Sequence, residues 1–201
     1  AGEILGETTK EYVFEACGEK LDMAQLQEIW EGKLEPVYPY RKAGPTVEKI
    51  NGKLTAPAAP KIGVAKPKVI IPVFPGTNCE YDTAKAFARA GADPEILVIR
   101  NLTPADVAES CKALVKAIDN SQIVMLPGGF SGGDEPDGSA KFIASFFRNP
   151  EVTEAVRRLL QQRDGLMLGI CNGFQALIKL GLVPYGDIRP ITSYDPTLTF
   201  N

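Results

Sequence analysis

The sequence predicts an α/β fold, a three-layer doubly wound sheet with mostly parallel strands, and three features support it. From residue 68 on, short apolar runs alternate with longer segments of helical periodicity. The apolar runs are bounded by Gly, Pro, Asp or Asn, as buried strands usually are. Two glycine-rich turns, at 127–134 and around Cys171, directly follow such runs. Right-handed crossovers would cover both faces of the sheet and bring both turns to the edge where ligands bind.

The apolar pattern predicts the elements of this domain in order. Strands are expected at 69–74, 96–99, 123–126 and 166–170. Helices are expected at 81–90, 103–118, 140–148 and 151–162, and a further helix through 176–180 is expected to stop at Gly181. Thr103 followed by Pro104 is a typical helix start, and Gly181 is a typical helix end. Pro72 cannot donate a ladder hydrogen bond, so it predicts a strand end or an edge strand at that point.

The residues before this domain have a different composition. Residues 1–35 are charged and mixed, and one helix is expected from Asp22 to Glu31. Residues 36–67 are rich in proline, alanine and glycine and predict an extended linker. We therefore expect an N-terminal unit at 1–35, a linker at 36–67 and the α/β domain at 68–201.

Composition excludes several classes of partner. The 201 residues are 44% hydrophobic and 23% charged, which is ordinary for a soluble globular protein. The net charge of −3 provides no basic surface for nucleic acid or an acidic membrane. The chain has no apolar run long enough to span a bilayer, and its first residues do not resemble a signal peptide. A cytoplasmic location is expected.

The cysteine and histidine content limits the chemistry. The spacing of Cys17, Cys79, Cys111 and Cys171 contains no C-x-x-C pair or metal-ligand pattern, so four reduced thiols and no metal site are expected. The chain contains no histidine. A cysteine nucleophile that attacks an amide normally needs a histidine as its general base, and a histidine-based zinc site is excluded.

Cys171 occupies a predicted strand-to-helix corner. The apolar run at 166–170 precedes it, and a helix follows. Gly169 and Gly173 flank it at two residues on either side, which removes the Cβ atoms that would clash in a sharp turn. A helix N-terminus also favours a thiolate and can hold an oxyanion. Cys171 is therefore a candidate nucleophile, although a buried structural cysteine is the alternative.

The glycine-rich loop at 127–134 has three possible interpretations. A phosphate cradle is disfavoured because the loop lacks both the G-K-[ST] ending of a P-loop and the G-x-G-x-x-G spacing of a dinucleotide site. A flexible glycine hairpin without chemistry is the second. The third is that one of its N–H groups joins that of Asn172 in an oxyanion hole for Cys171.

Three motifs together indicate a family. VFPGTNCE at 73–80, LPGGFSGGD at 126–134 and GICNGFQ at 169–175 resemble, in order and spacing, the glutaminase domain of phosphoribosylformylglycinamidine synthases, which are class I (triad) glutamine amidotransferases. The resemblance spans about residues 68–201 and implies a flavodoxin-like class I amidotransferase fold. LEPVYP at 34–39 is similar to the end of the preceding synthetase part in the long single-chain form.

The resemblance implies a function and a set of site residues. Cys171 would attack the side-chain amide of L-glutamine, form a glutamyl thioester and release ammonia. A separate synthetase domain, with ATP and Mg²⁺, would use that ammonia to convert formylglycinamide ribonucleotide to the amidine of purine biosynthesis; no cofactor is expected in this chain. Gly129 and Asn172 would supply the oxyanion N–H groups, and Phe130 and Gln175 would line the glutamine pocket. Gln175 could equally be an ordinary residue of the first helical turn, and Cys79 is expected to be a packed thiol.

The sequence departs from the family pattern in its last part. The family supplies its catalytic histidine and glutamate from a late H-x-E segment, which is absent from these 201 residues. We therefore expect a fold that is incomplete at the C-terminus, a truncated piece of the enzyme, and negligible glutaminase activity. Two alternatives remain: a non-catalytic docking module, and another α/β cysteine hydrolase of the intracellular protease or deglycase type.

Overall fold

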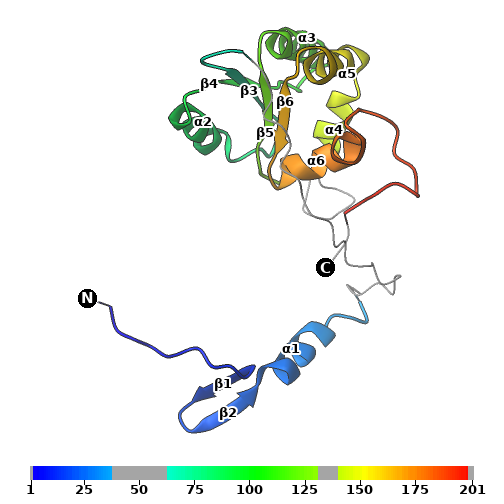
Figure 1. The fold of residues 1–201 in the computed structure, drawn as a ribbon. Helices are drawn as coiled ribbons and strands as arrows, with labels where there is room; N and C mark the ends of the chain where they lie inside the picture. Colours follow the sequence, from blue (N-terminus) through cyan, green and yellow to red (C-terminus); the bar gives the residue numbers. More distant parts are fainter. Residues whose placement is uncertain (1, 38–62, 131–139, 199–201) are drawn as a thin grey trace. The chain divides into compact units, whose positions relative to one another are not determined.

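The computed structural model describes residues 2–37, 63–130 and 140–198. The chain separates into two compact units, one formed by 1–53 with 200–201 and the other by 54–199 (Figure 1). Each unit is described here by itself. The predicted linker at 36–67 lies mostly outside the described residues.

The N-terminal unit is a β-hairpin followed by a helix. Its elements are β1 (Val13–Ala16), β2 (Glu19–Asp22) and α1 (Met23–Gly32). The helix is confirmed, since Asp22 caps it by accepting hydrogen bonds from the N–H groups of Ala24 and Gln25. The hairpin was not predicted because its strands mix charged with apolar residues. Its turn depends on Cys17 and Gly18, both in the left-handed region at φ 54° and 80°.

The second unit is built on a parallel sheet, as predicted. The strands are β3 (Lys68–Val73), β4 (Asp93–Val98), β5 (Ile123–Leu126) and β6 (Leu166–Gly169). Their order in the sheet is β4-β3-β5-β6, and every pairing between them is parallel. The carboxyl ends of all these strands therefore lie at one edge of the sheet.

The prediction that Pro72 marks a strand end or an edge strand is wrong. Pro72 lies within β3, which runs between β4 and β5. β3 pairs with β4 along its whole length, whereas its register with β5 contains only Val69 and Ile70. The proline is tolerated because the pairing with β5 ends before it.

The helices agree with the sequence pattern to within a few residues. They are α2 (Glu80–Arg89), α3 (Pro104–Asp119), α4 (Lys141–Phe147), α5 (Pro150–Arg157), α6 (Asn172–Leu180) and the short α7 (Leu182–Tyr185). A π-helical turn, Arg158–Gln162, extends α5. Thr103 and Asp106 form a reciprocal capping box at the start of α3, and Gly181 ends α6 at φ 89°.

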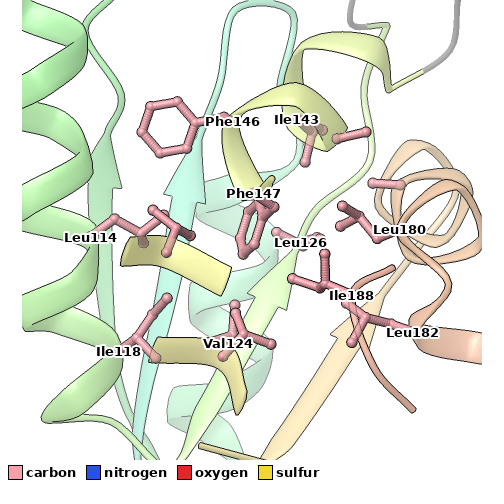
Figure 2. Close-up of a cluster of buried hydrophobic side chains, with 14 of the residues drawn as sticks. Leu114, Ile118, Val124, Leu126, Ile143, Phe146, Phe147, Leu180, Leu182 and Ile188 are labelled. Carbon is pink, nitrogen blue, oxygen red and sulfur yellow. The ribbon is translucent and has the colours of Figure 1, made fainter. Parts of the chain in front are cut away.

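The larger core lies between the sheet and α3, α4, α5 and α6 (Figure 1). Figure 2 shows the apolar side chains that meet there: Leu114, Ile118, Val124, Leu126, Ile143, Phe146, Phe147, Leu180, Leu182 and Ile188. Phe74, at the end of β3, packs edge-on against Phe142 and Phe146. This core fixes α6 and hence the residue that precedes it, Cys171.

The opposite face is covered less completely than a doubly wound sheet predicts. Val69, Ile71 and Met125 are buried there, partly beneath α2. Leu166, Leu168 and Ile170 alternate along β6 and are 40%, 45% and 53% exposed. Within the described residues, α2 therefore covers β3 and part of β4 on this face, whereas β6 is open.

Candidate active site

The loops that follow β3, β5 and β6 meet at one edge of the sheet. They carry the three motifs that the sequence singled out, because parallel strands end on the same side. The turn at 75–78 follows β3, the glycine loop that begins at 127 follows β5, and Cys171 follows β6. Residues 131–134 of the glycine loop lie outside the described residues.

Cys171 forms the sharp corner that was predicted. It lies between β6 and α6 with φ 52° and ψ −111°, a strained conformation for a residue with a side chain. Its side chain is exposed, so the alternative of a buried structural cysteine is wrong. The helix N-terminus directs N–H groups and positive dipole toward this position. An exposed sulfur on such a corner is placed to act as a nucleophile.

The glycines on either side of Cys171 are required by backbone packing. A Cβ atom on Gly169 would lie 2.5 Å from the carbonyl oxygen of Gly173. A Cβ atom on Gly173 would lie 2.0 Å from the carbonyl oxygen of Leu126 in β5. Real Cβ atoms essentially never come this close to backbone atoms. The G-x-C-x-G pattern therefore lets α6 begin directly against the sheet, which confirms the steric prediction.

The glycine loop is held by the turn after β3. The N–H of Asn78 donates to the oxygen of Gly128 at 3.2 Å, and the N–H of Phe130 donates to the oxygen of Gly76 at 2.8 Å. Thr77 and Gly129 thus form an antiparallel bridge. In such a pair, the N–H of Gly129 points away from Thr77. Gly129 has φ 144°, and a Cβ there would lie 2.2 Å from the oxygen of Gly76.

This loop contacts the cysteine corner. A Cβ atom built on Gly128 would lie 3.5 Å from Cβ of Cys171 and 3.7 Å from the oxygen of Ile170. The N–H of Ile170 donates to the oxygen of Leu126 at 3.1 Å, which continues the β5–β6 pairing up to the corner. The structure therefore brings the start of the glycine loop against Cys171, as the sequence predicted.

Asn172 and Gln175 lie in the first turn of α6. Asn172 is buried, and its side-chain Nδ2 donates to Oε1 of Gln175 at 3.2 Å. The N–H of Gln175 donates to the oxygen of Cys171 at 3.0 Å. These hydrogen bonds agree with Gln175 being an ordinary residue of the first helical turn. They also hold its side-chain amide next to Asn172, the residue after Cys171. Phe130, which is 64% exposed, extends the glycine loop on the other side.

Two residues at the end of the motif at 73–80 have features that its sequence did not predict. Cys79, the N-cap residue of α2, has its Sγ 3.7 Å from the Cβ position of Gly128 and is exposed, so the expected packed thiol is wrong. Glu80 has a buried Oε2 without a hydrogen-bond partner. The motif at 73–80 contains both residues, but only the folded chain reveals that Cys79 approaches the glycine loop.

The strongest electrostatic effects lie beyond α6. Hydrogen bonds from the Arg157 guanidinium lower the pKa of Asp187, and the Nε–Oδ1 distance is 2.8 Å. The pKa of Asp195 is also lowered, chiefly by a hydrogen bond from the Tyr185 hydroxyl and next by the N–H of Thr192. These groups fix the chain after α6 and contribute to its folding.

Metal sites and membrane-spanning helices are absent from the part of the chain that the structure describes. Residues 2–37, 63–130 and 140–198 contain no cluster of three or more His, Cys, Asp or Glu side chains that could hold a metal ion. No helix within those ranges is both long enough and apolar enough to cross a membrane. A hollow of about 430 Å³ lies beside α2 and extends to Leu168 and Ile170, next to the cysteine corner.

The fold and the corner define an α/β protein with a cysteine on a nucleophile elbow. Comparison with known families narrows this class. The CobB/CobQ-like glutamine amidotransferase domain matches residues 66–201, and the chain belongs to this family.

Curated relatives include subunits named phosphoribosylformylglycinamidine synthase subunit PurQ. The subunit from Dehalococcoides mccartyi is 37% identical over 123 residues, 60% of this chain and 43% of the relative. That from Cereibacter sphaeroides is 41% identical over 117 residues, 58% of this chain and 44% of the relative. The chain thus spans less than half the length of these relatives. A solved structure, PurLQS from Thermotoga maritima, matches with 27% identity and a TM-score of 0.40, covering 58% of this chain and 45% of that one.

Proposed function

We propose that this chain carries the glutaminase site of a phosphoribosylformylglycinamidine synthase. The observation that supports it best is the contact between the strained Cys171 corner and the glycine loop at Gly128. Membership in the glutamine amidotransferase family and the names of the PurQ relatives support the same assignment. The proposed substrate is L-glutamine.

In the proposed reaction, Sγ of Cys171 attacks the side-chain carboxamide carbon of glutamine. The carbonyl oxygen becomes an oxyanion, and the N–H groups of Gly129 and Asn172 donate hydrogen bonds to it. Collapse of this intermediate breaks the C–N bond, releases ammonia and leaves a γ-glutamyl thioester on Cys171. Water then hydrolyses the thioester to glutamate. Phe130 and Gln175 are proposed to line the pocket for the rest of the glutamine side chain.

The reaction needs a general base, which is normally a histidine, and these 201 residues contain no histidine. Proton transfer is required twice, from the thiol and to the departing nitrogen. Removal of the base from a comparable catalytic unit lowers kcat by about 10⁶-fold. We therefore propose that the chain binds and positions glutamine but hydrolyses it at a negligible rate by itself.

The ammonia would be consumed by a synthetase partner. ATP and Mg²⁺ are proposed to act there on formylglycinamide ribonucleotide, and no cofactor is proposed for this chain. The family match begins at residue 66, which supports assigning residues 68–201 to the amidotransferase domain. We also propose that residues 1–35 belong to a synthetase region and that 36–67 link the two. We place this activity in the cytoplasm, where exposed thiols stay reduced.

The test is covalent labelling by a chloroketone analogue of glutamine. The reduced chain is incubated with the reagent, and the adduct is located by intact mass and peptide mapping. We expect one adduct, on Cys171, whose formation slows when L-glutamine is added in excess. Cys17 is the matched control because it is also exposed but lies in the other unit.

Two outcomes contradict the proposal. Equal labelling of Cys17 and Cys171 would mean that the reagent detects thiol exposure alone. No labelling of a chain whose Cys111 remains protected, and which is therefore folded, would favour a docking module over a glutamine site.

A further inference from the structure

Two exposed cysteines lie close to the same glycine, Gly128. A Cβ atom on Gly128 would be 3.5 Å from Cβ of Cys171 and 3.7 Å from Sγ of Cys79, so both cysteines are close neighbours of the same small volume. Gly128 has no side chain to separate them. Both are free thiols, and Cys79 takes no part in the proposed hydrolysis of glutamine.

The fold itself creates this proximity. Cys79 caps α2 after β3, and Cys171 caps α6 after β6. β5 lies between these strands, which would normally separate their ends by about 10 Å. The turn at 75–78 narrows the gap because Asn78 is hydrogen-bonded to Gly128, which places Cys79 against the glycine loop.

We propose that Cys79 is a resolving cysteine that forms a reversible disulfide with Cys171. Hydrogen peroxide is the oxidant. The Cys171 thiolate attacks the peroxide O–O bond, which gives a sulfenic acid and releases hydroxide. The Cys79 thiolate then attacks the sulfenic sulfur, the S–O bond breaks, and the S–S bond forms with loss of a second hydroxide, which leaves as water. Two thiols are oxidised and one peroxide is reduced to water.

The surroundings of both sulfurs suit this sequence. Each cysteine is the residue that directly precedes a helix of nine or ten residues, and each is exposed. Exposure lets peroxide reach Cys171, and a nearby second thiol captures the sulfenic acid before it oxidises further. Cys111 is buried in the core and Cys17 belongs to the other unit, so neither shares this arrangement.

The disulfide would block the nucleophile and protect it from irreversible oxidation. It concerns the same sulfur as the proposed glutaminase reaction, but it depends on the positions of the two thiols and not on glutamine. Its failure and the failure of the proposed function are therefore separate results.

The test uses the full 201-residue chain with Cys17→Ser and Cys111→Ser, so that only the two thiols of interest remain. The chain is treated with hydrogen peroxide at low protein concentration, digested without reduction and mapped by mass spectrometry. We expect a peptide pair joined through Cys79 and Cys171, lighter by two hydrogens and separated again by dithiothreitol. Disulfides that join only separate molecules would overturn the proposal.

Two variants of the same chain test the mechanism. With Cys79→Ser, we expect the sulfenic acid on Cys171 to be trapped by a 1,3-diketone and, without the diketone, to oxidise further to the sulfinic acid. An unreacted Cys171, or one that over-oxidises no more readily than in the chain that keeps Cys79, would contradict a resolving role. With Gly128→Ala, a methyl group would lie 3.7 Å from Sγ of Cys79 and 3.5 Å from Cβ of Cys171, in the volume that both side chains border. We expect crosslinking to slow by about tenfold or more, with iodoacetamide still reaching both thiols, because exchange needs direct approach of the sulfurs. Unchanged crosslinking would refute the geometry.

Discussion

Replacing Gly173 by alanine should separate α6 from the sheet. The new Cβ would lie 2.0 Å from the oxygen, 2.6 Å from the carbonyl carbon and 2.8 Å from Cβ of Leu126. All three atoms belong to a buried strand residue, so no flexible side chain can move aside. The start of the helix must shift by more than 1 Å to restore an ordinary contact of at least 3.4 Å.

The magnitude follows from what that shift disturbs. Overpacking a well-packed core destabilises by about 1–3 kcal/mol, and the upper end applies here because the clash is with backbone. The hydrogen bond from Ile170 to the oxygen of Leu126 shares the crowded acceptor, and its loss contributes about 1 kcal/mol. Alanine regains up to about 1 kcal/mol of helix propensity. We expect a net loss of about 3 kcal/mol in the free energy of unfolding.

Cys111 provides the assay. It lies in α3 at 5% exposure, so its alkylation in increasing urea reports unfolding of this unit, and peptide mapping distinguishes it from the exposed cysteines. Burial raises the pKa of its thiol, which further suppresses reaction in the native state. Gly128→Ala is the matched control, since its Cβ has no neighbour closer than 3.5 Å. If Gly173→Ala were within 1 kcal/mol of this control, the close-approach explanation of the motif would be wrong.

Three further predictions test other parts of the unit by the same urea assay or by labelling. Thr103→Ala removes the capping box with Asp106 and should lower stability by about 1 kcal/mol. Asp187→Asn should lower it by about 1 kcal/mol at pH 7. Because Arg157 lowers the folded-state pKa of Asp187, that difference should shrink as the pH falls below the ordinary value of 3.8 and vanish below the folded pKa; a constant difference would contradict the ion pair. Gly129→Ala should abolish chloroketone labelling of Cys171, because its Cβ would displace the turn that holds the loop.

The sequence alone predicted the local elements of the α/β unit well. The strand at 123–126 was placed at its observed bounds, since a short apolar run between a helix end and a glycine turn has few alternatives. The capped helix start at Thr103 and the helix end at Gly181 were also found, because capping depends on residues close together in the sequence. Local chemistry was sufficient for each of these.

Weaker local signals gave errors. The hairpin at 13–22 lacks an alternating apolar face, so the sequence pattern did not predict it. Pro72 was expected at a strand end or an edge, but only the pairing registers on its two sides reveal why an inner strand accepts it. The exposed apolar residues of β6 were expected to be covered, because the general rule for parallel sheets assumes helices on both faces.

The cysteine corner combines both kinds of information. The glycines around Cys171 predicted a sharp strand-to-helix turn, and that turn is present with a strained, exposed cysteine. The sequence could not identify which atom excludes a side chain at Gly173, since Leu126 is distant in the chain and meets it only through the pairing of β5 with β6. For the same reason, the sequence did not reveal that Cys79 lies against the glycine loop.

Apolar periodicity, caps and turn residues act over a few positions, so the amino-acid sequence was sufficient to predict the fold class, most elements of the α/β unit and the nucleophile candidate. Only the tertiary structure reveals which loops are in contact. Gly128 lies beside both Cys171 and Cys79, and the turn at Gly76 holds the glycine loop through the N–H of Phe130. Those contacts depend on the order β4-β3-β5-β6 and on strand register, which bring residues about 40 to 90 positions apart to one edge of the sheet. A pattern of neighbouring residues cannot predict contacts between residues so far apart in the sequence.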